Sequence, residues 1–393
     1  MHVANDQLRT PLKRAPRPRR KLRAAEFFAG IGLVRLALEK QRQWSVVYAN
    51  DIEPMKARMY RDNWTKNDHL VVGDIHNIHA DSVPTVELFT ASFPCNDLSI
   101  AGRWDGLSGK ESSAFYGLIR ILDEMGDRRP PLVLLENVVG FLQADGGEHF
   151  ETALMALNRL GYTVDAFILN ARHWVPQSRA RLFVVARVSD AIDSAEVEVS
   201  DTRPEALCRF IDQHPHIRWS IRELPRLPKL TTLLPDIVQD LPEDDEHWWN
   251  DERADYLMTQ LSNRHEVQAR LLMANESWRY ATAFRRVRYG RSMAELRTDG
   301  IAGCLRTPRG GSGRQILIRL GKGQYRVRLL TARECARLQG VPDDYVINAP
   351  LNQALFGFGD AVCVSAVEWI AKHYLTPVAR ELPAPIEAGL LFR

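Results

Sequence analysis

Strand-like and helix-like segments alternate between residue 24 and about residue 190, and this alternation restricts the chain to few architectures. Short apolar runs are typical of buried strands, and longer runs with apolar residues three or four apart are typical of helices. We expect strands at Ala24–Ala29, Trp44–Asn50, Leu70–Gly73, Val86–Ser92, Leu132–Leu135, Val164–Leu169 and Leu182–Val188. We expect helices between them, for example at Leu33–Lys40, Phe115–Met125 and Phe150–Leu160. This pattern predicts an α/β fold with a mostly parallel sheet covered on both faces.

The remaining segments have other patterns. The alternation is lost from about residue 190 to 325, where Pro, Trp and charged residues are frequent, and we interpret this region as a smaller domain. Helical patterns return at Thr331–Gln339 and Val362–Tyr374. Residues 1–23 contain eight Lys/Arg and one acid, which predicts a basic disordered tail with non-specific affinity for phosphates. The predicted division is therefore 1–23, 24–190, 191–345 and a return to the large domain at 346–393.

Cysteine usage and hydropathy indicate the cellular environment of the chain. The five cysteines lie far apart without a Cys-x-x-Cys pair, so neither a zinc site nor a disulfide framework is indicated, and no metal is expected. No run of about 18 apolar residues predicts a membrane span, and the N-terminus has no apolar signal segment. A cytoplasmic location fits these features.

A glycine-containing turn follows the first expected strand and has the sequence Phe28-Ala29-Gly30-Ile31-Gly32. Glycines allow a tight turn and a close approach of the backbone to a ligand. Asp51 follows Gly30 by 21 residues at the end of the next strand, the position of a carboxylate that holds ribose hydroxyls. The third glycine that a pyrophosphate requires is missing, so a nucleoside ligand suits the turn better than NAD. Asp74 is a candidate for binding an adenine amino group, or else a helix N-cap.

A thiol and a carboxyl group follow the fourth and fifth expected strands. Cys95 follows Pro94 at the end of one strand, and Glu136 ends the next. Ligands of open α/β sheets bind beyond the carboxyl ends of the strands, so we expect both groups in one crevice. A buried cysteine and a helix-capping Glu are the structural alternatives. In Gln177-Ser178-Arg179-Ala180-Arg181, alternate residues share a face, and two guanidiniums there would hold an oxyanion or lower a thiol pKa, unless they form a surface charge stripe.

Taken in order, these segments resemble the motifs of the DNA cytosine-5 methyltransferase family. The resemblance covers about residues 24–375 and leaves only the presumed recognition segment unmatched. It is carried by Phe28–Gly32, Phe93-Pro94-Cys95-Asn96-Asp97-Leu98-Ser99, Glu136-Asn137-Val138, Gln177–Arg181, Arg333–Gly340 and Gly357–Val364.

The resemblance implies a Rossmann-like S-adenosylmethionine-dependent methyltransferase sheet with an inserted target-recognition domain. It implies Cys95, Glu136, Arg179 and Arg181 as catalytic residues. The cofactor-binding residues implied are Phe28, Ala29, Gly30, Ile31, Gly32, Asp51, Ile52, Asp74, Ile75, Pro94, Asp360 and Ala361.

The reaction implied is methyl transfer from S-adenosylmethionine to C5 of a cytosine in double-stranded DNA. Cys95 would add to C6, Glu136 would bind N3 and the 4-amino group, and Arg181 would bind O2. The base must first swing out of the duplex, and Asn96–Ser113 resembles the family's mobile catalytic loop, or is a plain surface loop. Candidate DNA contacts are Ser99, Arg103, Arg285, Arg286, Arg288, Arg309 and Arg314; solvated charged faces are the alternative.

Four positions depart from the commonest family pattern. Glu26 stands where the family commonly has Asp, and Leu33 stands where it frequently has Gly. Asn96 replaces the usual Gln, and Asp360 replaces the usual Asn. The carboxylate of Asp360 is expected to weaken or retune cofactor binding. By analogy we expect a monomeric, nucleoid-associated prokaryotic enzyme that marks host DNA against a cognate restriction or defence nuclease.

The sequence leaves three other functions open. One is an RNA cytosine-5 methyltransferase, although the Cys-Phe-Thr signature of that relative is missing. The others are an inactive DNA-binding module and a nucleotide-binding oxidoreductase.

Overall fold

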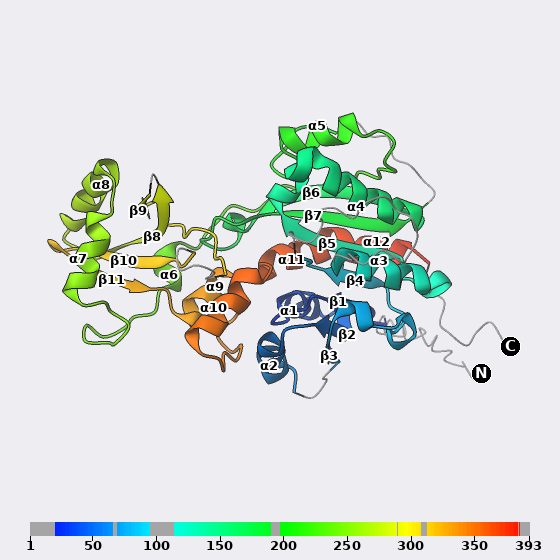
Figure 1. Ribbon diagram of the computed structural model, residues 1–393, viewed down its shortest axis with the longest axis horizontal. Helices are drawn as coiled ribbons and strands as arrows, with labels where there is room; N and C mark the ends of the chain where they lie inside the picture. The colour runs from blue at the N-terminus through cyan, green and yellow to red at the C-terminus, as the bar shows by residue number, and fades with distance from the viewer. Residues whose placement is uncertain are drawn as a thin grey trace, which may run out of the picture.

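The computed structural model describes residues 20–65, 69–94, 114–189, 197–288, 290–307, 313–383 and 385. The predicted nucleophile Cys95 lies outside the described residues, as do the loop 96–113 and most of the basic tail. Two lobes lie side by side, a large one built on a seven-stranded sheet and a small one built on a four-stranded sheet (Figure 1). Helices α6 (Leu234–Ile237), α9 (Ala332–Leu338) and α10 (Leu351–Asp360) lie between the two sheets (Figure 1).

The large sheet contains every strand expected between residues 24 and 190. Its strands are β1 (Leu22–Phe27), β2 (Trp44–Asp51), β3 (Leu70–Val72), β4 (Leu88–Ala91), β5 (Leu132–Val138), β6 (Tyr162–Asn170) and β7 (Ala180–Val188). They lie in the order β3-β2-β1-β4-β5-β7-β6, and only β7 runs antiparallel to its neighbours. The mostly parallel α/β sheet is thus confirmed. Because the strand order reverses between β1 and β4, a ligand crevice is expected beyond the carboxyl ends of these strands.

Apolar side chains on both faces of this sheet explain the continuous apolar runs of its strands. Leu132 and Leu134 of β5 belong to the core cluster on one face, and Val133 and Leu135 belong to the cluster on the other. Successive side chains of a strand point to opposite faces, so each run supplies both layers. The first layer includes α1 (Leu33–Lys40), α9, α10, α11 (Val364–Ile370) and α12 (Thr376–Glu381). The second includes α3 (Ala114–Glu124), α4 (Glu148–Arg159) and α5 (Glu205–Gln213).

Shorter elements connect these layers. They are α2 (Pro54–Asn63), the 3₁₀ segments η1 (Ile75–Asn77), η2 (Ala80–Ser82), η4 (Gly126–Arg128), η5 (Val139–Gly147) and η6 (Ala171–His173), and the π-helical turn η7 (Ala371–Leu375). The helical region Leu351–Glu381 is long and apolar enough to cross a membrane by length and composition. Two-thirds of its most apolar stretch is buried inside the molecule, as in the core helix of a globular protein.

The small lobe contains an antiparallel sheet in the order β11-β10-β8-β9. Its strands are β8 (Arg279–Arg288), β9 (Arg291–Arg297), β10 (Ile316–Gly321) and β11 (Gln324–Leu329), and helices α7 (Asp251–Thr259) and α8 (Asn263–Met273) cover one face. The sequence predicted a smaller domain here but not its strands. The small domain was predicted to begin at residue 191, yet Leu207, Phe210 and Trp219 pack in the core of the large lobe. The large lobe therefore extends past residue 190, because the apolar face of α5 is buried there.

Candidate active site

The turn after β1 is shaped by two glycines with positive φ angles, Gly30 at 57° and Gly32 at 80°. A Cβ atom at Gly32 would lie 2.5 Å from the ring of Trp64, so both the backbone angle and the available space require glycine there. Gly32 is the N-cap of α1, which places the first turn of that helix beside the carboxyl end of β1. The turn therefore brings Gly30 and its neighbours Phe28, Ala29 and Ile31 to the space beyond the sheet.

Asp51 holds this turn in place. Its Oδ2 atom accepts a hydrogen bond from the backbone N–H of Gly30 at 2.7 Å, and its Oδ1 atom accepts one from Glu53 at 2.8 Å. Each carboxylate oxygen can accept a further hydrogen bond, so these contacts are compatible with the predicted bond to a ribose. Asp74 caps η1 by accepting a hydrogen bond from the backbone N–H of His76 at 2.9 Å. This is the N-cap role that the sequence offered as an alternative to adenine binding.

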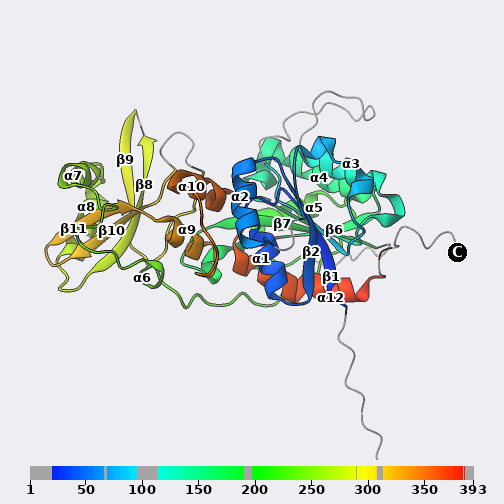
Figure 2. The same ribbon diagram turned by 90° about the horizontal axis from the view of Figure 1, so that it is seen from below.

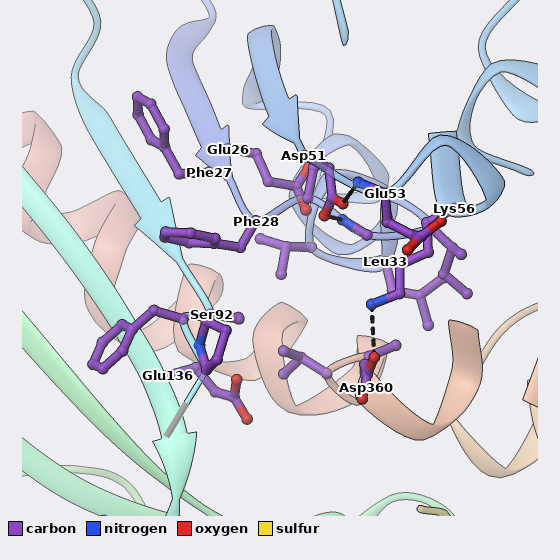
Figure 3. A pocket seen from close by; sticks show the side chains of 18 of the residues that line it. Glu26, Phe27, Phe28, Leu33, Asp51, Glu53, Lys56, Ser92, Glu136 and Asp360 are labelled. Atoms are coloured by element: carbon purple, nitrogen blue, oxygen red, sulfur yellow. Dashed lines mark hydrogen bonds and ion pairs between the residues drawn. The ribbon is translucent and has the colours of Figure 1, made fainter. Parts of the chain in front are cut away.

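A cavity of about 1010 Å³ lies beyond the carboxyl ends of β1, β2, β4 and β5. Figure 3 shows Asp51, Glu136 and Asp360 arranged around it, with the side chain of Lys56 reaching Asp360. All predicted cofactor residues except Gly32 line this cavity: Phe28, Ala29, Gly30, Ile31, Asp51, Ile52, Asp74, Ile75, Pro94, Asp360 and Ala361. Glu136, Arg179 and Arg181 line the same cavity. The sequence-predicted groups that the structure describes thus meet in one place.

Glu136 and Arg181 form an ion pair inside this cavity. The Nε atom of Arg181 lies 3.1 Å from Oε1 of Glu136, and both side chains are mostly buried. The pair arises because β5 and β7 are antiparallel neighbours whose register brings Val138 opposite Arg181. Next to it, the side-chain amide of Asn137 donates to the carbonyl oxygen of Phe93 at 3.2 Å. Asn137 therefore ties the end of β5 to the segment that leads through Pro94 to Cys95.

Arg179 and Gln177 are turned into the protein rather than toward the cavity centre. The guanidinium of Arg179 donates to the carbonyl oxygens of Leu305, Gly359 and Ala361 at 2.8, 3.1 and 2.7 Å. Gln177 donates to Leu338 at 2.7 Å and accepts from the N–H of Leu305 at 2.9 Å. Both side chains therefore connect β7 to the segments that flank the small lobe, which is a positioning role.

Two further polar groups line the cavity, and sequence reasoning did not assign either of them to the site. Glu26 is buried on β1, its Oε2 atom has no hydrogen-bond partner among the described residues, and burial raises its pKa to about 8 despite the nearby charge of Arg35. The Sγ atom of Cys304 lies 3.3 Å from Nη1 of Arg179. Although burial opposes ionisation, the charges of Arg179 and Arg181 lower the pKa of this thiol.

The departure predicted to affect cofactor binding, Asp360, has a partner. Its Oδ2 atom lies 2.6 Å from Nζ of Lys56, and the Asp360 side chain is half exposed. The pair joins the C-terminal end of α10 to α2 at one side of the cavity. The negative charge of Asp360 is therefore balanced by the protein itself.

The predicted DNA contacts that can be described lie on or beside the small sheet. Arg286 and Arg288 of β8 share the carboxylate of Glu295 at 3.7 and 2.5 Å. Arg314 donates to Oδ1 of Asn352 at 2.7 Å, and Arg285 lies against the ring of Trp249. Ser99, Arg103 and Arg309 lie outside the described residues, as Cys95 does.

The family model of the C-5 cytosine-specific DNA methylases matches residues 22–376, which is most of the chain. The protein belongs to this family. The resemblance inferred from the ordered motifs is thereby confirmed, and the protein is a DNA (cytosine-5-)-methyltransferase.

Relatives of known activity match nearly the whole chain. The type II methyltransferase M.DsaV of Dactylococcopsis salina is 26% identical over 359 residues, covering 91% of this chain and 87% of that protein. The type II methyltransferase M.HhaI of Haemophilus parahaemolyticus is also 26% identical, covering 90% and 94%. Among solved structures, the Dnmt2 methyltransferase of S. pombe has a TM-score of 0.60 at 19% identity, covering 91% of this chain and 99% of its own. This last likeness supports the methyltransferase fold.

Proposed function

We propose that this methyltransferase uses S-adenosylmethionine to methylate C5 of a cytosine that has swung out of duplex DNA, with Cys95 as the covalent nucleophile. The observation that carries the proposal is the meeting of Glu136, Arg181 and the Pro94 end of β4 at one cavity. Asn137 holds the backbone just before Cys95 against the strand that bears Glu136. The next residue in the chain, Cys95, is therefore the proposed nucleophile for this cavity.

The described residues fit S-adenosylmethionine. The glycine turn brings the backbone of Gly30 to the space beyond β1, and the same cavity is lined by Glu26, whose buried Oε2 atom has no partner among the described residues. Asp51 would hold the ribose, and Asp74 would accept a hydrogen bond from the adenine amino group. When bound, the cofactor supplies an electrophilic methyl group. Phe28, Ile52 and Ile75 offer apolar surface in the same cavity.

In the proposed reaction, the thiolate of Cys95 adds to C6 of cytosine and raises the electron density at C5. Glu136 donates a proton or a hydrogen bond to N3, which stabilises the charge that develops on the ring. The same carboxyl group accepts a hydrogen bond from the 4-amino group, which thymine lacks. Arg181 is positioned through its contact with Glu136 to bind O2, and Arg179 holds the surrounding segments in place. Once C5 carries the methyl group, loss of the C5 proton and of the Cys95 thiolate restores the aromatic ring.

The small lobe would read the DNA sequence, with Arg285, Arg286, Arg288 and Arg314 as described contacts. The relatives M.DsaV and M.HhaI are type II methyltransferases, which supports a role in marking host DNA against a nuclease that acts on the same sequence. Sequencing of methylated sites in cells that express the protein would identify its recognition sequence and test this role.

The proposal is tested by incubating the protein with labelled S-adenosylmethionine and duplex DNA, tRNA or no acceptor. We expect label in DNA only, with the methyl group on C5 of cytosine. Cys95→Ser is expected to abolish transfer while the binding of S-adenosylmethionine, measured by calorimetry, is retained. Full activity of this variant would refute the covalent mechanism, and label in tRNA alone would refute the proposed substrate.

A further inference from the structure

Two arginines, Arg253 and Arg285, lie over one tryptophan at the edge of the small sheet. The Cζ atom of Arg253 on α7 lies 3.9 Å from the ring centroid of Trp249, and that of Arg285 on β8 lies 5.7 Å from the same ring. Arg285 also lies 6.0 Å from the ring of Tyr256. Trp249 is almost fully buried, and its backbone N–H donates to the carbonyl oxygen of Val327 at 2.9 Å. It therefore provides a fixed surface for two guanidiniums.

This cluster lacks the negative charge that balances other arginines of the small lobe. Arg286 and Arg288 pair with Glu295, and Arg319 and Arg326 pair with Glu243. Within the described part of the chain, no carboxylate pairs with Arg253, Arg285 or Arg314. Arg314 donates only to the neutral side chain of Asn352 at 2.7 Å.

The three charges are close enough to affect one another. Burial lowers the pKa of Arg253, and the positive charges of Arg285 and then Arg314 lower it further. No carboxylate contributes to this shift. Holding like charges together costs free energy unless an anion lies between them, so the arrangement is typical of a site for an anionic ligand.

The cluster is linked through α10 to the catalytic cavity. Figure 2 shows the β8–β9 hairpin projecting beyond its sheet on the side of the molecule where α10 lies. Asn352, which binds Arg314, is in the first turn of α10, and Asp360 at the other end of this helix lines the catalytic cavity. A single helix of 10 residues thus connects the arginine cluster to the site of chemistry.

We infer that Arg253, Arg285 and Arg314 together bind one backbone phosphate of the duplex that carries the target cytosine. This inference rests on the proposed DNA substrate and adds to it a defined contact that includes Arg253. A phosphate fits better than a base edge, because guanine presents neutral acceptors to a single arginine, whereas neighbouring guanidiniums without a carboxylate partner match a negative charge. The contact would therefore strengthen binding to every sequence and would select none.

The test measures the affinity of a short fluorescent duplex of arbitrary sequence as a function of salt concentration. Each phosphate contact contributes about 0.9 to the slope of log K against log salt. We expect Arg253→Gln to reduce the magnitude of that slope measurably but by less than about 0.9, because Arg285 and Arg314 still contact the phosphate. Arg253→Lys keeps the charge and is expected to restore most of the slope. The triple change of Arg253, Arg285 and Arg314 to Gln is expected to lose about 0.9 in all, since the three share one phosphate.

Arg270→Gln is the matched control, because Arg270 is an exposed arginine of the same lobe that already pairs with Glu266. It should leave the slope unchanged. An unchanged slope in Arg253→Gln, a loss confined to one DNA sequence, or a threefold larger loss in the triple variant would overturn the inference. Methyl transfer by the wild-type enzyme to DNA is measured separately, so failure of the proposed function would be recognised independently of the slopes.

Discussion

The Sγ atom of Cys304 lies 3.3 Å from Nη1 of Arg179 and 4.0 Å from Nη2 of Arg181. The Cys304 thiol thus contacts the guanidinium of Arg179, which precedes β7, and that of Arg181, which belongs to β7, inside the catalytic cavity. Burial works against ionisation, but the two positive charges lower the pKa of Cys304 below its usual value. The proposed active site therefore contains a second thiol besides that of Cys95.

We predict that Cys304 reacts with iodoacetamide faster than the other cysteines of a Cys95→Ser variant. The thiolate is the reactive form, and Cys304 is partly accessible. Burial raises the pKa of Cys335 and of Cys363, the latter to about 11, so both should react slowly. Peptide mass spectrometry over a time course would measure the rates. Labelling of Cys363 at the rate of Cys304 would contradict the prediction.

Glu136→Gln should reduce kcat/KM by about 10²–10⁴-fold, because an amide cannot supply the proton that the ring nitrogen needs. It also removes the ion pair with Arg181. Binding of S-adenosylmethionine should change little, which calorimetry would check. Glu151→Gln is a suitable control, because Glu151 pairs with His216 on the surface of the large lobe. Wild-type turnover by Glu136→Gln would exclude the proposed proton donor.

Asp360→Asn should change the dissociation constant of S-adenosylmethionine by less than about fivefold, the equivalent of about 1 kcal/mol. The reason is that Lys56 already neutralises this half-exposed carboxylate at 2.6 Å. Equilibrium binding of the cofactor to the wild-type and variant proteins would measure the effect. A change of more than tenfold would mean that Asp360 contacts the cofactor directly.

The sequence predicted site residues best where polar or reactive side chains stand at the ends of expected strands. Glu136 was expected at a crevice beyond the carboxyl ends of the strands, and Asp51 was expected to hold a ribose at the end of its strand; both line the cavity. The small sheet was not predicted, because β8 buries small residues such as Ala281 and Ala283 between arginines and so lacks apolar alternation. Cys304 was missed for a related reason, since it lies in a segment without periodicity and reaches the site only through long-range contacts with Arg179.

The stability of the protein should depend on pH through Glu26. Burial raises its pKa from 4.5 to about 8, although Arg35 opposes this shift. An acid with a raised pKa stabilises the folded state fully below its unfolded pKa, and this contribution is lost as the pH rises through about 8. The free energy of unfolding should fall by at most about 1.4 kcal/mol per pH unit across that window. Urea unfolding of the wild type and of Glu26→Gln between about pH 5 and 8 would test this, since the variant should lack this component.

The two lobes are joined by a buried ion pair, and its removal should destabilise the protein strongly. Arg328 on β11 donates to both carboxylate oxygens of Glu334 on α9, at 2.7 and 2.5 Å, and both side chains are fully buried. Glu334 also accepts from the backbone N–H groups of Thr331 and Gln239, each at 2.8 Å. Glu334→Ala leaves the buried guanidinium without a counter-charge, although Nη1 still donates to the carbonyl oxygen of Leu329, and it leaves two amides without an acceptor. We expect it to lower the free energy of unfolding by about 3–5 kcal/mol.

A second variant distinguishes two causes of the lost stability, namely the missing attraction between the two charges and the burial of an unpaired charge. Replacing both Arg328 and Glu334 by Met removes the charges together, and we expect it to recover much of the stability that Glu334→Ala loses. Urea unfolding of the three proteins would measure this, with DNA binding as a second readout of how the lobes are held. If the double variant were less stable than Glu334→Ala, the pair would contribute net attraction that exceeds its desolvation cost. The interface between β11 and α9 would then depend on the ion pair itself and not only on the absence of an unpaired charge.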